Sequence, residues 1–101
     1  MDEIVKLIEQ WSKEKGLDQS EPSRQMLKVI EEVGEVSAAL VRNDKLALVD
    51  GIGDVVVTLV ILAQQNNLSL YDCVIAAYSE IKDRKGKMVN GTFVKEADLN
   101  G

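Results

Sequence analysis

The chain of 101 residues contains no histidine, one cysteine and one proline, and aromatic residues make up 4% of it. The lack of histidine excludes Ser-His and Cys-His nucleophilic catalysis and zinc sites built on imidazole. One cysteine excludes an internal disulfide, so we expect Cys73 to be a small core residue in a reducing compartment. There is also no phosphate-binding loop of the GxxxxGK[ST] kind.

Other absences limit where the protein can act and which partners it can bind. The net charge of −5 argues against a general nucleic-acid binder, which would need a basic face. Asp2 and Glu3 stand where a signal peptide would be basic. The longest apolar run, about a dozen residues, is too short for a bilayer. We therefore expect a soluble cytoplasmic protein that binds neither nucleic acid nor membrane.

The residue pattern predicts an all-α, four-helix bundle-like fold, with helices over residues 2–15, 23–41, 45–65 and 70–85. The valine run at 55–57 is also compatible with a strand, but no turn signal or partner strand accompanies it. Residues 1–87 form the predicted domain. Residues 88–101 are expected to be a turn and tail, with a turn at Asn90-Gly91, a short extended piece or tail at 92–94 and frayed residues from 96 to 101.

Apolar residues make up 46% of the chain, more than a small solvated bundle needs. A domain of this size buries only a modest core by itself. The excess therefore favours a homo-oligomer that buries the region from Val55 to Leu62.

The segment 28–40 predicts a helix with an apolar back and an acidic face. Glu31, Glu32 and Glu35 fall on one stripe about 100° wide, with Lys28 inside it. A stripe of this kind is usually a solvated face, and that alternative stays open for this helix alone.

The segment 51–63 is apolar on every side of a helix, which is typical of a buried helix. Asp50 and Asp54 leave the same side of it, and Asp54 is expected to be shielded from water. Because unpaired buried carboxylates are costly, we interpret the two acidic helices as a metal site. Carboxylate oxygens suit magnesium, or manganese, rather than zinc or copper.

Two further features have two interpretations each. The basic end of the fourth helix, with Lys82, Arg84, Lys85 and Lys87, either compensates the helix dipole or clamps phosphates above the metal. Trp11 is either a core or interface anchor or a platform for a nucleotide base. Carboxylates, magnesium and nearby lysines together indicate hydrolysis of a phosphoanhydride.

The sequence Glu31-Glu32-x-x-Glu35, followed by Gly53-Asp54 before a long apolar stretch and then a basic helix end, resembles the MazG-like all-α nucleotide pyrophosphohydrolases. The resemblance covers about residues 1–87, and the C-terminal segment looks like short stand-alone members from phages and Gram-positive bacteria. It implies magnesium-dependent hydrolysis of a nucleoside triphosphate to the monophosphate and pyrophosphate, by a helical homodimer or homotetramer.

The family places metal ligands at i and i+3 on each helix. Glu32, Glu35 and Asp54 match that pattern, whereas Gly51 stands where the fourth acid is expected and Asp50 is its substitute. Glu31 is then the general base or an orienting residue. The resemblance assigns phosphate contacts to Ser79, which replaces the family's Asn, and to Lys82, Arg84 and Lys85. We expect the nucleotide base to lie against the ring of Trp11 or Phe93.

Two other classes of function remain. One is a non-catalytic nucleotide-sensing or interaction module with a degenerate metal site, and the other is a structural bundle whose acids face water. The sequence does not specify the preferred base or sugar, the number of metal ions, or dimer against tetramer.

Overall fold

The structure is a computed structural model and describes residues 2–99. Most of these residues are helical, which confirms the all-α class. The helices are α1 (Asp2–Glu14), α2 (Pro22–Val41), α3 (Lys45–Gln65), α4 (Leu70–Ile81) and the short α5 (Glu96–Leu99), with a 3-10 turn, η1, at Leu17–Gln19. Two strands, β1 (Gly86–Val89) and β2 (Thr92–Lys95), form an antiparallel hairpin.

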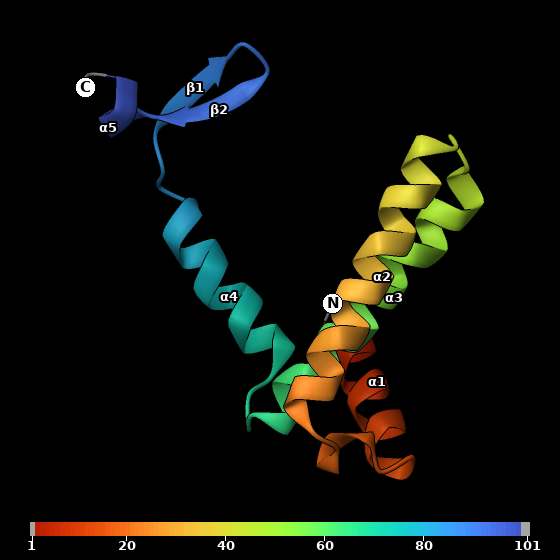
Figure 1. The fold of residues 1–101 in the computed structure, drawn as a ribbon. Helices are drawn as coiled ribbons and strands as arrows, with labels where there is room; N and C mark the ends of the chain where they lie inside the picture. Colours follow the sequence, from red (N-terminus) through yellow and green to blue (C-terminus); the bar gives the residue numbers. More distant parts are fainter. Residues whose placement is uncertain (1, 100–101) are drawn as a thin grey trace.

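Helix α3 is the centre of the fold (Figure 1). Helix α2 runs antiparallel along one side of it, and α1 packs on another side without contacting α2. The buried apolar residues all come from these three helices: Val5, Val29, Ala39, Val60, Ile61 and Ala63. Three predicted helices therefore share one core.

Three glutamine side chains make hydrogen bonds that join α2, α1 and η1 to α3. The Gln25 amide of α2 donates to the carbonyl oxygen of Thr58 at 3.0 Å. The Gln64 and Gln65 amides of α3 donate, also at 3.0 Å, to the carbonyl oxygens of Glu9 and Leu17. These bonds satisfy part-buried backbone oxygens across the helix contacts, where an unpaired group would be costly.

The residues that end helices and join the two strands have the conformations that their types predict. Gly16, Asn67 and the pair Asn90-Gly91 all have positive φ, from 51° to 81°. Glycine and asparagine adopt this left-handed conformation most readily. Asp44, in the short connection between α2 and α3, caps α3 by accepting from the Ala47 amide at 3.0 Å.

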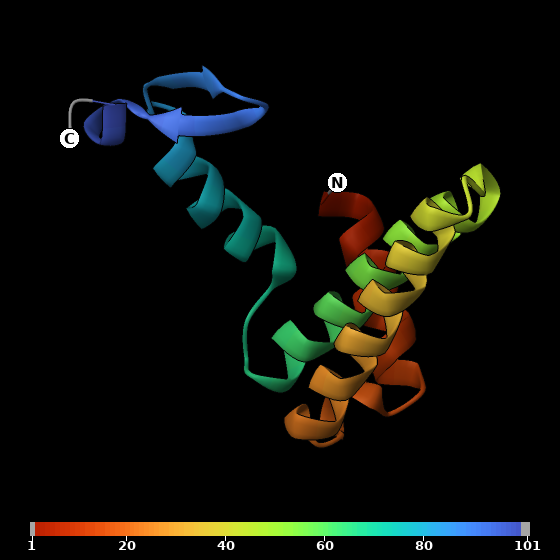
Figure 2. The ribbon, with the colours of Figure 1, turned by 45° about the horizontal axis from the view of Figure 1, so that its top comes forward.

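Helix α4 departs from the predicted bundle. It ends at Ile81, not at residue 85, and it leads away from the other helices toward the hairpin in both views (Figures 1 and 2). None of its residues is buried. Its expected core face is open, with Leu70 half-buried and Cys73, Val74, Ala77 and Ile81 exposed. The prediction that Cys73 is a core residue is wrong for this chain, because nothing packs over that helix face.

The C-terminal segment has more structure than predicted. Strand β1 pairs with β2 in the register Gly86↔Lys95 to Val89↔Thr92, so the extended interpretation of 92–94 is confirmed. Residues 96–99, expected to fray, form α5 and contact both strands. The division into residues 1–87 and 88–101 stays a prediction, and β1 runs across it.

Helix α3 is also longer than the apolar run counted in the sequence. By length and composition alone its 21 residues could cross a membrane, so the expectation that the run is too short is wrong. Only 22% of its apolar window is buried in one chain, although α1 and α2 pack against it. A core helix of a soluble protein passes the same test, and α3 has that position in the fold.

Candidate functional site

The contact between α2 and α3 sets where the acidic residues lie. Gly51 faces Val36 at close range, and Gln25 reaches the Thr58 carbonyl further along the pair. The sides of the two helices that face each other are therefore known. Because each residue advances about 100° around a helix, every other side chain can be placed relative to Val36 and Gly51.

The acids of both helices fall on the same side of this contact. Glu32 and Glu35 lie about 40° and 100° to one side of Val36. On α3, Asp54 and Asp50 lie about 60° and 100° to the same side of Gly51, since the two helices run antiparallel. This is the side on which α1 packs. The predicted convergence of acidic stripes from two helices is therefore present at the level of the helix faces.

The burial of these acids is less than the sequence suggested. Glu32 and Asp54 are half-buried, and Glu31, Glu35 and Asp50 are exposed. The prediction that Asp54 is shielded from water is wrong for the single chain, because α3 is covered on only two sides. Among residues 2–99, no three acidic or thiol side chains lie close enough to hold a metal ion as arranged here.

Asp50 and Asp54 open into a groove between α1 and α3. The groove has a volume of about 500 Å³, and its lining includes Ile4, Val5 and Ile8 of α1 as well as both aspartates. The prediction that the two aspartates leave the same side of α3 is thereby confirmed. One end of an otherwise apolar channel thus carries two carboxylates.

Trp11 lies further along the same channel. A second hollow of about 300 Å³ is lined by Leu7, Ile8, Trp11 and Val57, and it shares Ile8 and Val57 with the first. Trp11 is 45% exposed, so it is not a core anchor within one chain. From Ile4 to Trp11 the channel follows seven residues of helix, or about 10 Å.

The other predicted substrate contacts lie elsewhere. Ser79 is exposed on α4, and Lys82, Arg84 and Lys85 follow that helix in an exposed segment. Within residues 2–99, α4 has no contact with α2, and the hairpin contacts only α5. Phe93, in β2, packs its ring over Gly86 instead of facing Trp11. A single chain therefore does not bring its basic segment to its acids.

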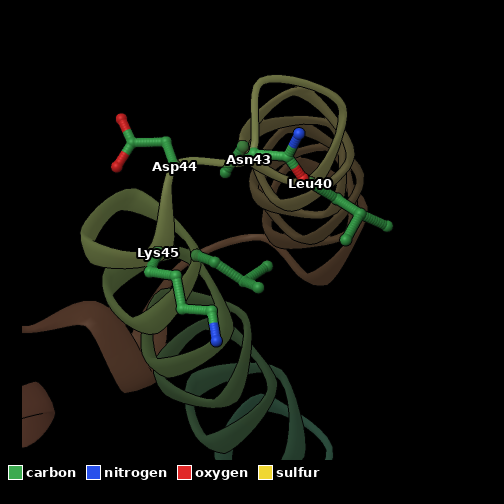
Figure 3. Close-up of a pocket in the computed structure, with 6 residues that line it drawn as sticks. Leu40, Asn43, Asp44 and Lys45 are labelled. Carbon is green, nitrogen blue, oxygen red and sulfur yellow. The ribbon is translucent and has the colours of Figure 1, made fainter.

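A smaller hollow of about 110 Å³ lies at the turn between α2 and α3, beside Leu40, Asn43, Asp44 and Lys45 (Figure 3). The Asp44 carboxylate and the Lys45 ammonium extend in different directions in this view. The carboxylate already accepts the capping hydrogen bond from Ala47. This hollow is therefore part of the helix cap and offers no converging polar groups.

Comparisons with known proteins point to one family. Residues 20–89 match the family model of the MazG nucleotide pyrophosphohydrolase domain, which confirms the resemblance drawn from the acidic helix. An uncharacterized 18.2 kDa protein from the rep-hol intergenic region of Haemophilus phage HP1 is 38% identical over 69 residues. That alignment covers 67% of this chain but only 42% of the phage protein. No solved structure matches.

The matched range includes α2, α3 and α4 with the acidic residues and the basic segment. It leaves out α1 with Trp11, and Phe93 in β2. The carboxylates therefore lie within the part that the family shares, while the two aromatic residues lie outside it.

Proposed function

The chain belongs to the MazG nucleotide pyrophosphohydrolase family, and we propose that it converts nucleoside triphosphates and water to monophosphates and pyrophosphate with magnesium. Membership implies a hydrolase that acts on nucleotide phosphoanhydride bonds. The observation that carries the finer proposal is the placement of Glu32, Glu35 and Asp54 on one side of the α2–α3 pair, beside an apolar groove.

The donor set fits magnesium, or manganese, in its chemistry. All four proposed ligands, Glu32, Glu35, Asp50 and Asp54, are carboxylates, the hard oxygen donors that these ions prefer. The glutamates have enough rotatable bonds to bring their oxygens toward the aspartates. A bound divalent ion supplies Lewis-acid polarisation of the phosphates and acidifies a water.

The remaining roles fall to residues of the chain itself. We assign Glu31 to accept a proton from the attacking water, or to orient it, because it is exposed beside Glu32. Attack at the α-phosphorus leaves pyrophosphate as the leaving group. The nucleotide base would lie in the channel toward Trp11, whose ring can stack on any purine or pyrimidine.

The phosphates need cations as well. We keep Lys82, Arg84 and Lys85, with Ser79, as their proposed contacts, since lysine and arginine bind phosphate oxygens strongly. These residues lie away from the acids of their own chain, so the role requires that α4 pack against a helical body. We propose a cytoplasmic homodimer or homotetramer in which this packing occurs.

The test is a product assay with a panel of deoxynucleoside triphosphates and magnesium. We expect one pyrophosphate per monophosphate and no orthophosphate. Glu35→Gln should lower kcat at least 100-fold, because one ligand loses its charge. The control, Glu21→Gln, makes the same charge change at the N-cap of α2, about 16 Å along the helix from Glu32, and should keep full activity. Unchanged turnover in Glu35→Gln would remove the role assigned to it.

A non-catalytic nucleotide-binding module is the second candidate, and Gly51 favours it, because this position lacks the acid that completes the family pattern. The two candidates differ in turnover. Calorimetric binding of a non-hydrolysable triphosphate with magnesium, combined with no product release from the natural substrate, would select the second.

A further inference from the structure

The two hollows beside α1 form one channel whose walls change in character along its length. Asp50 and Asp54 line one end of it, and Trp11 lines the other. Ile8 of α1 and Val57 of α3 line both hollows, so they form the stretch between the carboxylates and the indole ring. Both side chains are half-buried. The middle of the channel therefore has an apolar wall on each of its two helices.

This middle stretch offers no hydrogen-bond partner to a bound group. Apart from the two aspartates and Trp11, the residues that line the two hollows have aliphatic side chains or, at Gly53, none. The backbone N–H and C=O groups of Ile8 and Val57 lie inside helices, where the helical hydrogen bonds already engage them. A hydroxyl placed between these two side chains would lose its water and gain no partner.

A nucleotide in this channel presents its sugar to the middle stretch. This placement rests on the proposed function, in which the phosphates lie at the carboxylates and the base lies at Trp11. In the sugar, C3′ is joined through C4′ to the carbon that carries the phosphates, whereas C2′ is joined directly to the carbon that carries the base. The 3′-hydroxyl therefore lies nearer Asp50 and Asp54, which can accept a hydrogen bond, and the 2′ position lies nearer Ile8 and Val57.

We propose that Ile8 and Val57 make the protein select 2′-deoxynucleotides, with little selection among the four bases. A ribonucleotide would bury its 2′-hydroxyl against two aliphatic side chains without a hydrogen-bond partner, and this lost hydration weakens its binding. An apolar site rejects a substrate that merely adds a hydroxyl by no more than about 100-fold. We therefore expect kcat/KM to favour the deoxy sugar by about 10- to 100-fold.

The base end of the channel lacks the polar groups that would distinguish one base from another. Leu7, Ile8 and Val57 have no donor or acceptor in their side chains, and the indole N–H of Trp11 lies in the plane of its ring. A base stacked on the face of that ring does not meet this donor. Because every base has a π-face, stacking tolerates all four, and we expect the deoxynucleotides to differ by less than about 10-fold.

The sugar preference is measured on the wild-type chain as kcat/KM, with magnesium and matched pairs of deoxy- and ribonucleoside triphosphates. A 2′-deoxy-2′-fluoro triphosphate identifies the cause, because fluorine is close to a hydroxyl in size but donates no hydrogen bond. We expect the fluoro compound to behave as the deoxynucleotide does. A fluoro compound as poor as the ribonucleotide would assign the preference to size or sugar shape and would overturn the proposal.

Val57→Thr tests the wall of the channel, because it keeps the shape of the side chain and adds a hydroxyl near the 2′ position. We expect the preference for the deoxy sugar to fall by about 10-fold, since the 2′-hydroxyl gains a partner. Val55→Thr is the matched control. It makes the same change on the same helix, but Val55 lines a hollow with Val33 and Val36 of α2, so the preference should stay unchanged.

Binding of non-hydrolysable analogues tests the same preference without turnover, so its failure is distinct from failure of the proposed reaction. Calorimetry with magnesium and α,β-imido triphosphates should give a Kd at least about 10-fold lower for the deoxy analogue than for the ribo analogue. Equal Kd values, binding of neither analogue, a base preference larger than the sugar preference, or an unchanged preference in Val57→Thr would each overturn the proposal. Equal turnover of both sugars would leave the proposed reaction standing.

Discussion

A side chain at position 51 would make a tight contact with Val36. A Cβ atom on Gly51 would lie 3.1 Å from Cγ2 of Val36 and 3.6 Å from its Cα. The family pattern asks for an acid at this position, and the close approach of α2 and α3 leaves little room for one. Glycine at this position is compatible with the close helix contact, and the exposed Asp50 stands one residue earlier.

The close contact predicts opposite effects of one substitution at two glycines. Gly51→Ala should lower the free energy of unfolding by about 1 kcal/mol, because overpacking outweighs the gain in helix propensity. Val36 is β-branched and has little rotamer freedom with which to move away. Gly34→Ala should raise the same free energy by about 1 kcal/mol, since a Cβ there meets nothing within 4 Å. Urea titration measures the free energy of unfolding of both variants. Equal changes in the two variants would contradict the close contact at Gly51.

Ser12 predicts a stabilising substitution. Its side chain is fully buried, and its hydroxyl oxygen has no hydrogen-bond partner. Ser12→Ala removes an unsatisfied polar atom and improves helix propensity, so we expect about 1 kcal/mol of added stability. Chemical denaturation of the two proteins compares them directly. A loss of more than 1 kcal/mol would mean that the hydroxyl has a partner in solution.

Local patterns in the sequence were enough for the helices of the body and for their turns. Gly16, Asn67 and Asn90-Gly91 have the positive φ that their residue types favour. The placement of α4 was not predictable in this way. Its apolar face predicts burial but does not specify what buries it, and the chain's own α2 does not.

For the candidate site, too, the sequence predicted the helix faces but not the packing around them. Helical spacing alone placed Glu32 and Glu35 on one face and Asp50 and Asp54 on another. It could not give the depth of burial, which depends on how many helices surround α3, so Asp54 is more open than expected. The three glutamines that bind the elements to α3 carry no periodic signal and were missed.

The homo-oligomer put forward under the proposed function makes a prediction about the site itself. If the basic segment serves the other copy, Glu35→Gln and the triple variant Lys82→Ala, Arg84→Ala, Lys85→Ala should each be nearly inactive alone. Refolding them together should restore activity, up to one quarter of that of wild type. Half of the dimers are then mixed, and each mixed dimer has one site with both sets intact.

The control for this mixture is each variant refolded with itself at the same total concentration, which should stay inactive. If activity is absent from the mixture while wild type is active and dimeric, the acids and cations belong to one chain. That result would remove the shared site without affecting the proposed reaction.

The central claim is that water attacks the α-phosphorus of a nucleoside triphosphate at the carboxylates of α2 and α3. The most direct measurement is hydrolysis of a deoxynucleoside triphosphate with magnesium in water labelled with the oxygen-18 isotope. Mass spectrometry of both products then locates the label. We predict the label in the monophosphate and none in the pyrophosphate. Label in pyrophosphate or orthophosphate, or no hydrolysis with any triphosphate, would contradict the account.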